Sequence, residues 1–140
     1  MGDVNGDGTT DLILQNGGTV VDWVLQNGSY HAGSVISTTA NGWTVVGTGD
    51  FNGDGTTDVL LQNGNTVVDW IMQNGQFQSG NVLSTTAAGF TVVGTGDDNG
   101  AGTSDILLQN GNTIVEWNIQ NGLYQSGHTV GTVGCGFVVR

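Results

Sequence analysis

Segments rich in aspartate, asparagine and glycine occur three times in the sequence and carry the side chains best suited to chemistry. They read DVNGDGTTD from Asp3, DFNGDGTTD from Asp50 and DDNGAGTSD from Asp97. Calcium takes roughly six to eight oxygen ligands. A loop with side-chain oxygens at positions 1, 3 and 5 and a backbone carbonyl at position 7 can surround the ion where glycine permits the tight turn. The pattern therefore predicts calcium-binding loops.

The predicted ligands follow from these positions, with a further aspartate at position 9. They are Asp3, Asn5, Asp7, Thr9 and Asp11 in the first loop, Asp50, Asn52, Asp54, Thr56 and Asp58 in the second, and Asp97, Asn99, Thr103 and Asp105 in the third, each threonine through its carbonyl. An EF-hand would have glutamate at position 12, where all three copies have leucine. Magnesium fits a loop rich in protein oxygens less well. The alternative to an ion site is a turn that merely solvates its carboxylates.

The third loop lacks one of these ligands. Ala101 stands where the other loops have aspartate, so the charge of the ligand set falls from -3 to -2 and water must supply one oxygen. Asp98 adds a charge at position 2, which we expect to point away from the ion. We therefore predict strong calcium binding in the first two loops and weak or absent binding in the third.

The charge of the chain argues against several classes of partner. Its 140 residues include 12 acids and a single basic residue, Arg140, which gives a net charge of -11. Phosphate backbones and anionic membranes would be repelled by such a surface. No apolar run approaches the roughly 20 residues that span a bilayer, and the N-terminus has no signal-peptide pattern. We expect a soluble chain that neither binds nucleic acid nor inserts into membranes.

The acidic loops open three tandem units at a spacing of 47 residues. The units cover residues 3–49, 50–96 and 97–140, and the first two are identical at 33 of 47 positions. The third unit keeps the register but diverges after Gly127. A repeat of this length predicts one repeat domain over residues 1–140.

Short β-branched, aromatic and apolar runs alternate with turns marked by Asn-Gly pairs. In the second unit they predict strands over residues 44–49, 58–62, 66–73 and 77–83. The third of these strands is apolar on both faces, so both should be covered. Four-stranded units that bury both faces against neighbours are typical of all-β propeller blades, three in this chain. A β-solenoid, with shorter coils, is the main alternative.

The chain begins and ends within blades of this pattern. It opens at an acidic loop without the strand before it, and residues 136–140 repeat that missing strand. Closed propellers usually have about four to eight blades. Two chains would supply six blades. We therefore predict a homodimer that forms one six-bladed ring, with each 136–140 strand completing the first blade of its partner.

The run GWTVVGTGDFNGDGTTDVLLQN, residues 42–63, resembles the FG-GAP and VCBS repeats of integrin α-subunits and of many secreted bacterial proteins. The resemblance covers nearly the whole chain, and Ala101 alone breaks its ligand pattern. It implies propeller blades with calcium in the loop between the first two strands, an extracellular or secreted parent protein, and a role in adhesion or ligand recognition. The similarity of the units also suggests a trimmed or engineered piece of a longer array.

Aromatic residues recur at three positions of the repeat. They are Trp23, Trp70 and Trp117; Tyr30, Phe77 and Tyr124; and Trp43, Phe90 and Phe137. Packing between blades is their expected role. The alternative is a sugar-binding platform between blades, with nearby Asn and Gln side chains as hydrogen-bonding groups, which would make the chain a multivalent lectin.

The remaining polar residues form no catalytic constellation. Asp22, Asp69 and Glu116 recur in mid-strand, where we expect them to face solvent; lining a central channel or contacting a ligand are the alternatives. His31 and His128 occupy unrelated repeat positions, and no base is placed to activate a hydroxyl. We therefore predict a calcium-binding structural or adhesive module and not an enzyme, with a glycan or an extracellular protein as its ligand.

Overall fold

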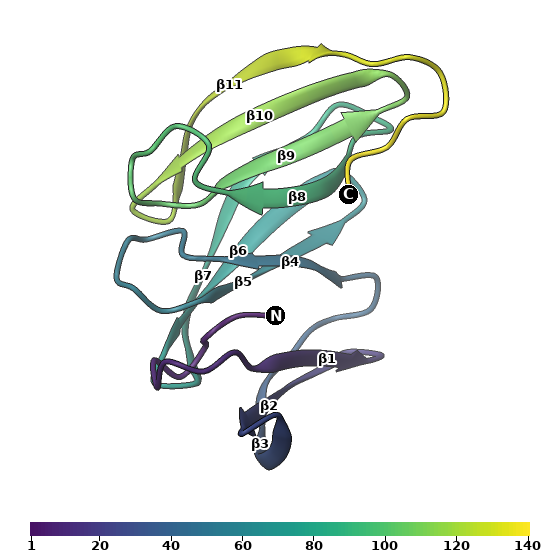
Figure 1. The fold of residues 1–140 in the computed structure, drawn as a ribbon. Coiled ribbons are helices and arrows are strands. Elements are labelled where there is room, and N and C mark those ends of the chain that lie inside the picture. The colour runs from purple at the N-terminus through teal and green to yellow at the C-terminus, as the bar shows by residue number, and fades with distance from the viewer.

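The computed structural model describes all residues, 1–140, and contains eleven β-strands. The strands are β1 (Leu12–Asn16), β2 (Thr19–Gln26), β3 (Ser29–Thr38), β4 (Thr44–Gly49), β5 (Asp58–Asn63), β6 (Thr66–Gln73), β7 (Gln76–Thr85), β8 (Thr91–Gly96), β9 (Asp105–Asn110), β10 (Thr113–Gln120) and β11 (Leu123–Thr132). They form three antiparallel sheets stacked one above another (Figure 1). The predicted all-β class is confirmed.

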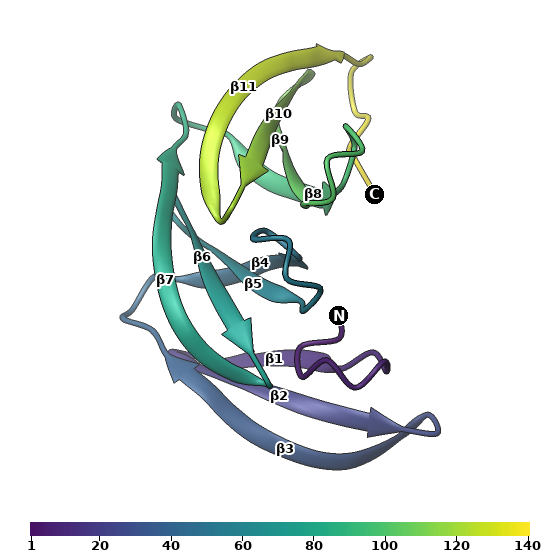
Figure 2. The ribbon, with the colours of Figure 1, turned by 90° about the vertical axis from the view of Figure 1, so that its left-hand side faces the viewer.

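The three sheets have the arrangement of β-propeller-like blades. Their strand orders are β1-β2-β3, β4-β5-β6-β7 and β8-β9-β10-β11, and we call them the first, second and third sheets. Strand β4 contacts β8 at one edge of the stack, whereas β7 contacts β3 and β11 at the other. Both chain termini lie on the side of β4 and β8, which we call the inner edge (Figure 2).

The first sheet has three strands, as predicted for a blade that lacks its innermost strand in the single chain, and the other two sheets have four. At the inner edge of the first sheet only Gly2 pairs with the sheet, through an isolated bridge to Asp11. Residues 136–140 adopt no strand, because no other strand of the chain is paired with them. In the second sheet the predicted strands 44–49 and 66–73 are confirmed, and the other two extend slightly beyond the predicted bounds.

Only half of the Asn-Gly pairs form the turn that the sequence suggests. At Asn74-Gly75 both residues have positive φ, 51° and 75°, which suits a two-residue hairpin loop between β6 and β7. At Asn63-Gly64 the asparagine instead pairs with Thr66 in the ladder, and Gly64 and Asn65 make the loop. The turn therefore starts one residue later, because only Gly64 there has positive φ.

Two apolar clusters lie between the sheets and make up the core. The cluster between the first and second sheets contains Val4, Val20, Ile36, Val59, Leu61, Trp70 and Met72. The cluster between the second and third sheets contains Phe51, Leu60, Val67, Leu83, Ile106, Leu108, Trp117 and Ile119. Strand β6 contributes to both clusters, so both of its faces are covered, as its sequence predicts. No helix of the structure could span a membrane.

The recurring mid-strand acids are buried, and the expectation that they face solvent is wrong. Asp22 is 1% exposed, Asp69 is fully buried and Glu116 is 8% exposed. A Cβ atom on Gly122 would lie 3.3 Å from the Asp69 carboxylate, so the β10–β11 turn covers this residue. Burial raises the pKa of Asp69 to about 6, although N–H groups bonded to its carboxylate act in the opposite direction.

Candidate functional site

The acidic loops lie at the inner edge, before β1, between β4 and β5, and between β8 and β9. In the first loop the side-chain oxygens of positions 1 and 3 converge on one backbone N–H. The Asp7 N–H donates to Asp3 Oδ1 at 3.0 Å and to Asn5 Oδ1 at 2.8 Å. The second loop repeats these contacts at 3.2 and 2.9 Å, and the third at 2.9 and 2.7 Å. The fold of the loop is therefore the same in all three units.

Two glycines allow each loop to fold around its first aspartate. Gly6 and Gly8 have φ values of 76° and 86°, a region that L residues with side chains rarely adopt. Their N–H groups donate to the Asp3 carboxylate at 2.7 and 2.9 Å. The Asp3 side chain thus lies at the centre of the turn, with several N–H groups stabilising its negative charge.

The aspartate at position 5 lies beside this centre and is held ionised. Asn5 Nδ2 donates to Asp7 Oδ2 at 3.2 Å, and the Thr9 hydroxyl and N–H both bind Asp7 Oδ1. The hydrogen bonds from Thr9 hold the pKa of Asp7 below its ordinary value. In Asp54 burial acts to raise the pKa, but bonds from Thr56 and Asn52 outweigh it and the pKa is lowered. Both carboxylates are anions at neutral pH.

The third loop keeps its shape without a carboxylate at position 5. The Ala101 N–H bonds the same two side chains, Asp97 and Asn99, and the Gly102 N–H binds Asp97 Oδ2 at 2.9 Å. The aspartate at position 5 is therefore not needed to form the turn. Its side chain in the first two loops is available for another role.

The aspartates at position 9 are fully buried beneath the loops. Asp58 accepts N–H bonds from Phe51 at 3.0 Å and from Met72 at 2.8 Å, so it ties the loop to β6. Burial raises the pKa of Asp58 to about 7, and the nearby charges of Asp54 and Asp50 add to the rise. In the first and third loops one carboxylate oxygen at this position, on Asp11 and Asp105, has no hydrogen-bond partner.

These residues fit a hard cation that prefers oxygen ligands. Carboxylates repel one another in the second loop, and the chain has only Arg140 as a basic side chain. Two loops hold a buried carboxylate oxygen that nothing in the protein satisfies. No three His, Cys, Asp or Glu side chains are grouped to hold a metal by themselves. A calcium ion would therefore depend on the Asn amide and Thr carbonyl oxygens as well as on the carboxylates.

Neighbouring loops are hydrogen-bonded to each other, which the sequence analysis missed. The Thr57 N–H donates to the Asp3 carbonyl at 2.9 Å, and the Ser104 N–H donates to the Asp50 carbonyl at 2.7 Å. Position 8 of one unit therefore holds position 1 of the unit before it. The sequence signal for this contact is the small size of the two residues that meet there. A Cβ atom on Gly49 would lie 2.7 Å from the Ser104 side chain, so only glycine fits beside it.

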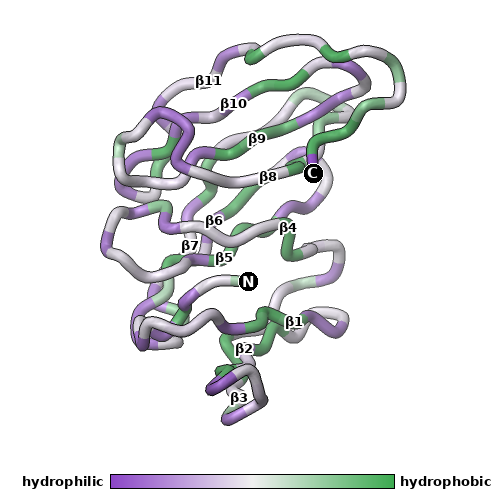
Figure 3. Tube along the Cα trace, viewed as in Figure 1, coloured by the Kyte–Doolittle hydropathy of each residue, from purple (hydrophilic) through white to green (hydrophobic).

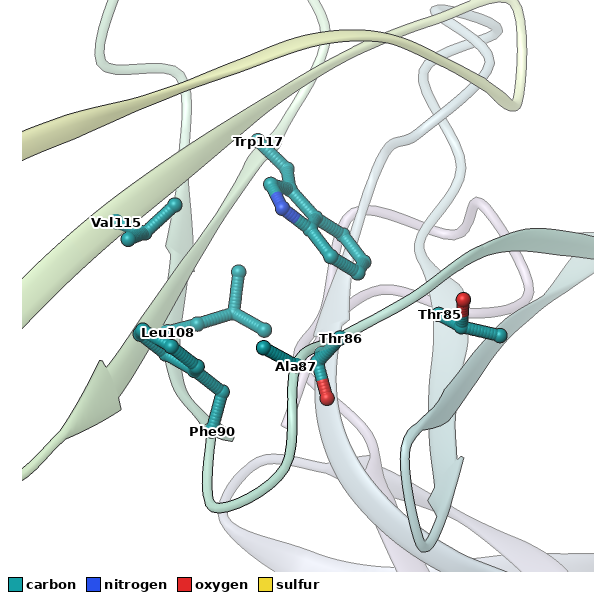
Figure 4. Close-up of a pocket in the computed structure, with 7 residues that line it drawn as sticks. All are labelled: Thr85, Thr86, Ala87, Phe90, Leu108, Val115 and Trp117. Carbon is teal, nitrogen blue, oxygen red and sulfur yellow. The ribbon is translucent and has the colours of Figure 1, made fainter.

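A second candidate site recurs between the sheets. One pocket of about 140 Å³ lies between the second and third sheets and is lined by Thr85, Thr86, Ala87, Phe90, Leu108, Val115 and Trp117. Trp117 projects toward the segment that carries Thr86 and Ala87 (Figure 4). The equivalent pocket between the first and second sheets, of about 190 Å³, is lined by Thr39, Ala40, Trp43, Leu61, Val68 and Trp70. Two of the three recurring aromatic positions thus pack between sheets and line these pockets.

The aromatics of the outer strands pair with these tryptophans. The rings of Trp70 and Phe77 lie 5.4 Å apart and nearly perpendicular, as do those of Trp117 and Tyr124. Opposite Trp70 is Gly80, where a Cβ atom would lie 3.2 Å from the indole. The absence of a side chain at this position gives the indole room to lie against β7.

The comparisons with known proteins agree with this fold. An FG-GAP-like repeat model matches residues 3–61. Over 96% of its length the chain is similar to part of a chain in the structure of the Photorhabdus luminescens Tc holotoxin pore, with a TM-score of 0.64 and 17% identity. It spans 7% of the length of that chain. No curated protein matches the sequence. Residues 3–61 are thus similar to the FG-GAP-like repeats, and the strands that follow repeat the same antiparallel topology in β-propeller-like blades.

Proposed function

We propose that the chain is a calcium-binding β-propeller module of an extracellular or secreted protein, with a structural, adhesive or ligand-recognition role. The convergence of position 1 and position 3 oxygens beside an ionised aspartate at position 5 carries the proposal. Asp3, Asn5 and Asp7, and their equivalents Asp50, Asn52 and Asp54, would hold the ion. Bound calcium would supply the positive charge that the loops lack.

The number of strong calcium sites tests the proposal. We expect a competition titration with a chelator to show two strong sites in the natural chain. Ala101→Asp, which restores the residue of the other two loops, should add a third site because the turn is already formed there. Asp54→Ala, which copies the third loop into the second, should remove one site.

Removal of calcium is the matching stability experiment. We expect EDTA to lower the melting temperature of the natural chain, because binding to the folded state alone stabilises it by mass action. Asp54→Ala should show a smaller EDTA effect. A melting temperature that EDTA leaves unchanged, or three equal strong sites in the natural chain, would show that the loops do not act as proposed.

A multivalent carbohydrate-binding role is the second candidate, favoured by the recurring pockets. Each pocket combines an indole wall with threonine, and the Thr86 hydroxyl is buried without a hydrogen-bond partner. Sugars stack their apolar faces on aromatic rings while buried polar groups fix their orientation. A hydroxyl of a small sugar would satisfy Thr86.

A glycan array followed by tryptophan fluorescence titration tests this candidate. We expect a hit to alter the emission of Trp117 or Trp70, which line the pockets. Thr86→Val keeps the shape of the side chain but removes its hydroxyl and should weaken binding in the pocket between the second and third sheets. Absence of any glycan hit by the calcium-loaded protein would remove the candidate.

A further inference from the structure

Large apolar side chains are exposed on the face of the first sheet that points away from the second. Trp23 is 42% exposed, whereas its equivalents Trp70 and Trp117 are 9% and 7% exposed. Leu14 is 37% exposed, while its two equivalents are 1% exposed. In the second and third sheets these positions pack on the sheet before them. The first sheet therefore presents the surface on which another sheet would pack.

The C-terminal segment is held in the position of an innermost strand. Gln109 Nε2 donates to the Phe137 carbonyl at 2.8 Å, and the Val139 N–H donates to Gln109 Oε1 at 3.0 Å. Gln15 makes the same two bonds to residues around the start of β4, and Gln62 makes them to residues around the start of β8. Residues 137–139 thus lie against the third sheet as β4 lies against the first.

This segment lacks the antiparallel partner that β4 and β8 have. Strand β4 pairs with β5, and β8 pairs with β9. Phe137 and Val138 are 69% and 54% exposed, although the residues equivalent to Phe137 pack against the two core clusters. The segment has a free backbone edge and a free apolar side chain.

The inner edge of β1 lacks most of the strand that pairs with the equivalent edges of β5 and β9. Gly2 pairs with Asp11 as Gly49 pairs with Asp58. The Thr48 hydroxyl donates to the Met1 carbonyl at 2.9 Å, as the hydroxyl of Thr95 donates to the carbonyl of Thr48. Met1 and Gly2 therefore occupy the last two positions of an innermost strand, and the edge of β1 beyond them is unpaired.

We propose that residues 137–140 of one copy of the chain add to β1 of a second copy, and that two such joints close a ring of two chains. If the joint has the register in which β4 pairs with β5, the equivalent residues of the repeat place Val138 opposite Gln15 and Val139 opposite Leu14. Phe137 then covers Trp23 and Leu14 of the second copy. Each chain supplies both halves of the joint, so a second copy is the occupant that fits this register.

The joint would also form a third pocket from both copies. By the repeat spacing, its walls are Val133, Gly134 and Phe137 of one chain and Leu14, Val21 and Trp23 of the other. Val133 stands where the other two pockets have a threonine, Thr39 or Thr86. The third pocket is therefore more apolar than the other two.

One residue makes this joint weaker than the joints within the chain. Val4 and Phe51 are fully buried at the second position of their loops, but Asp98 takes that position in the third loop and is exposed. In the joint Asp98 would approach apolar residues of the partner's first sheet. Asp98→Phe, which copies the second loop, is expected to tighten the association.

The mass in solution, measured by light scattering in calcium, tests the proposal. We expect the natural chain to show twice the 14.4 kDa of one chain. Val138→Pro should restore the mass of one chain, because the Val139 N–H points toward Gln109 and the neighbouring Val138 N–H, which proline lacks, is the one that faces β1 of the partner. Val138→Thr is the matched control, since Thr44 and Thr91 are its equivalents, and it should retain the double mass.

The fold of Val138→Pro is checked by circular dichroism. Its spectrum should be close to that of the control, because Val138 is exposed in the single chain. A natural chain with the mass of one copy at all concentrations would overturn the proposal. So would a mass of three or more chains, or an equal mass for the proline and threonine variants.

Discussion

Phe51→Ala is expected to lower the free energy of unfolding by about 3–5 kcal/mol, because it removes a fully buried ring from the cluster between the second and third sheets. Phe51 packs with Ile106 and Ile119 of the next unit, so the cavity would open between two sheets and weaken their contact. Equilibrium denaturation followed by tryptophan fluorescence measures the change.

Two further variants define what the Phe51 result means. Phe51→Val copies the first unit, where Val4 has this position, and should cost less because part of the volume remains. Tyr30→Ala removes an aromatic ring that is 59% exposed and should cost about 1 kcal/mol or less. Equal losses for Phe51→Ala and Tyr30→Ala would contradict the assignment of Phe51 to the core.

Asp58→Ala should lower the free energy of unfolding by about 2–4 kcal/mol, because two buried N–H groups lose their acceptor. These donors belong to Phe51 and Met72, so the substitution separates the loop from β6. The burial that raises the pKa of this carboxyl shows that its charge is costly, and losing that charge offsets part of the effect. Denaturation at constant pH measures the balance.

Measurement in EDTA separates this anchoring role of Asp58 from any role in binding an ion. The cost of Asp58→Ala should persist without calcium, because the two N–H bonds do not depend on the ion. Asp54 is exposed at its loop, so the cost of Asp54→Ala should largely disappear in EDTA. If both variants lose the same stability with and without calcium, the distinction between the two aspartates is wrong.

Much of the fold follows from local patterns in the sequence. The repeat fixes equivalent strands, and hairpin turns need positive φ, which Gly and Asn supply. The bounds of β4 and β6 follow directly from these signals. The shifted turn at Gly64 does not, because Asn63-Gly64 and Asn74-Gly75 are the same dipeptide in different ladder registers.

Contacts between units were harder to anticipate than contacts within a unit. Alternation along β6 shows that Asp69 and Trp70 face opposite ways, but not that a turn of the next sheet covers Asp69. Likewise, the loop sequence gives its candidate ligands but not the bonds from Thr57 and Ser104 to neighbouring loops. These contacts depend on the stacking of sheets, which no single repeat contains.

The glutamine side chains hold the successive segments of the molecule in the same way. Each of the three glutamines, Gln15, Gln62 and Gln109, hydrogen-bonds the backbone carbonyl 28 residues ahead and the backbone N–H 30 residues ahead. These bonds involve no side chain of the segment that the glutamine holds. These bonds therefore contribute equally to every joint, and differences between joints come from side chains such as Asp98. Genetic duplication to six covalently linked units would therefore need no new contact surface.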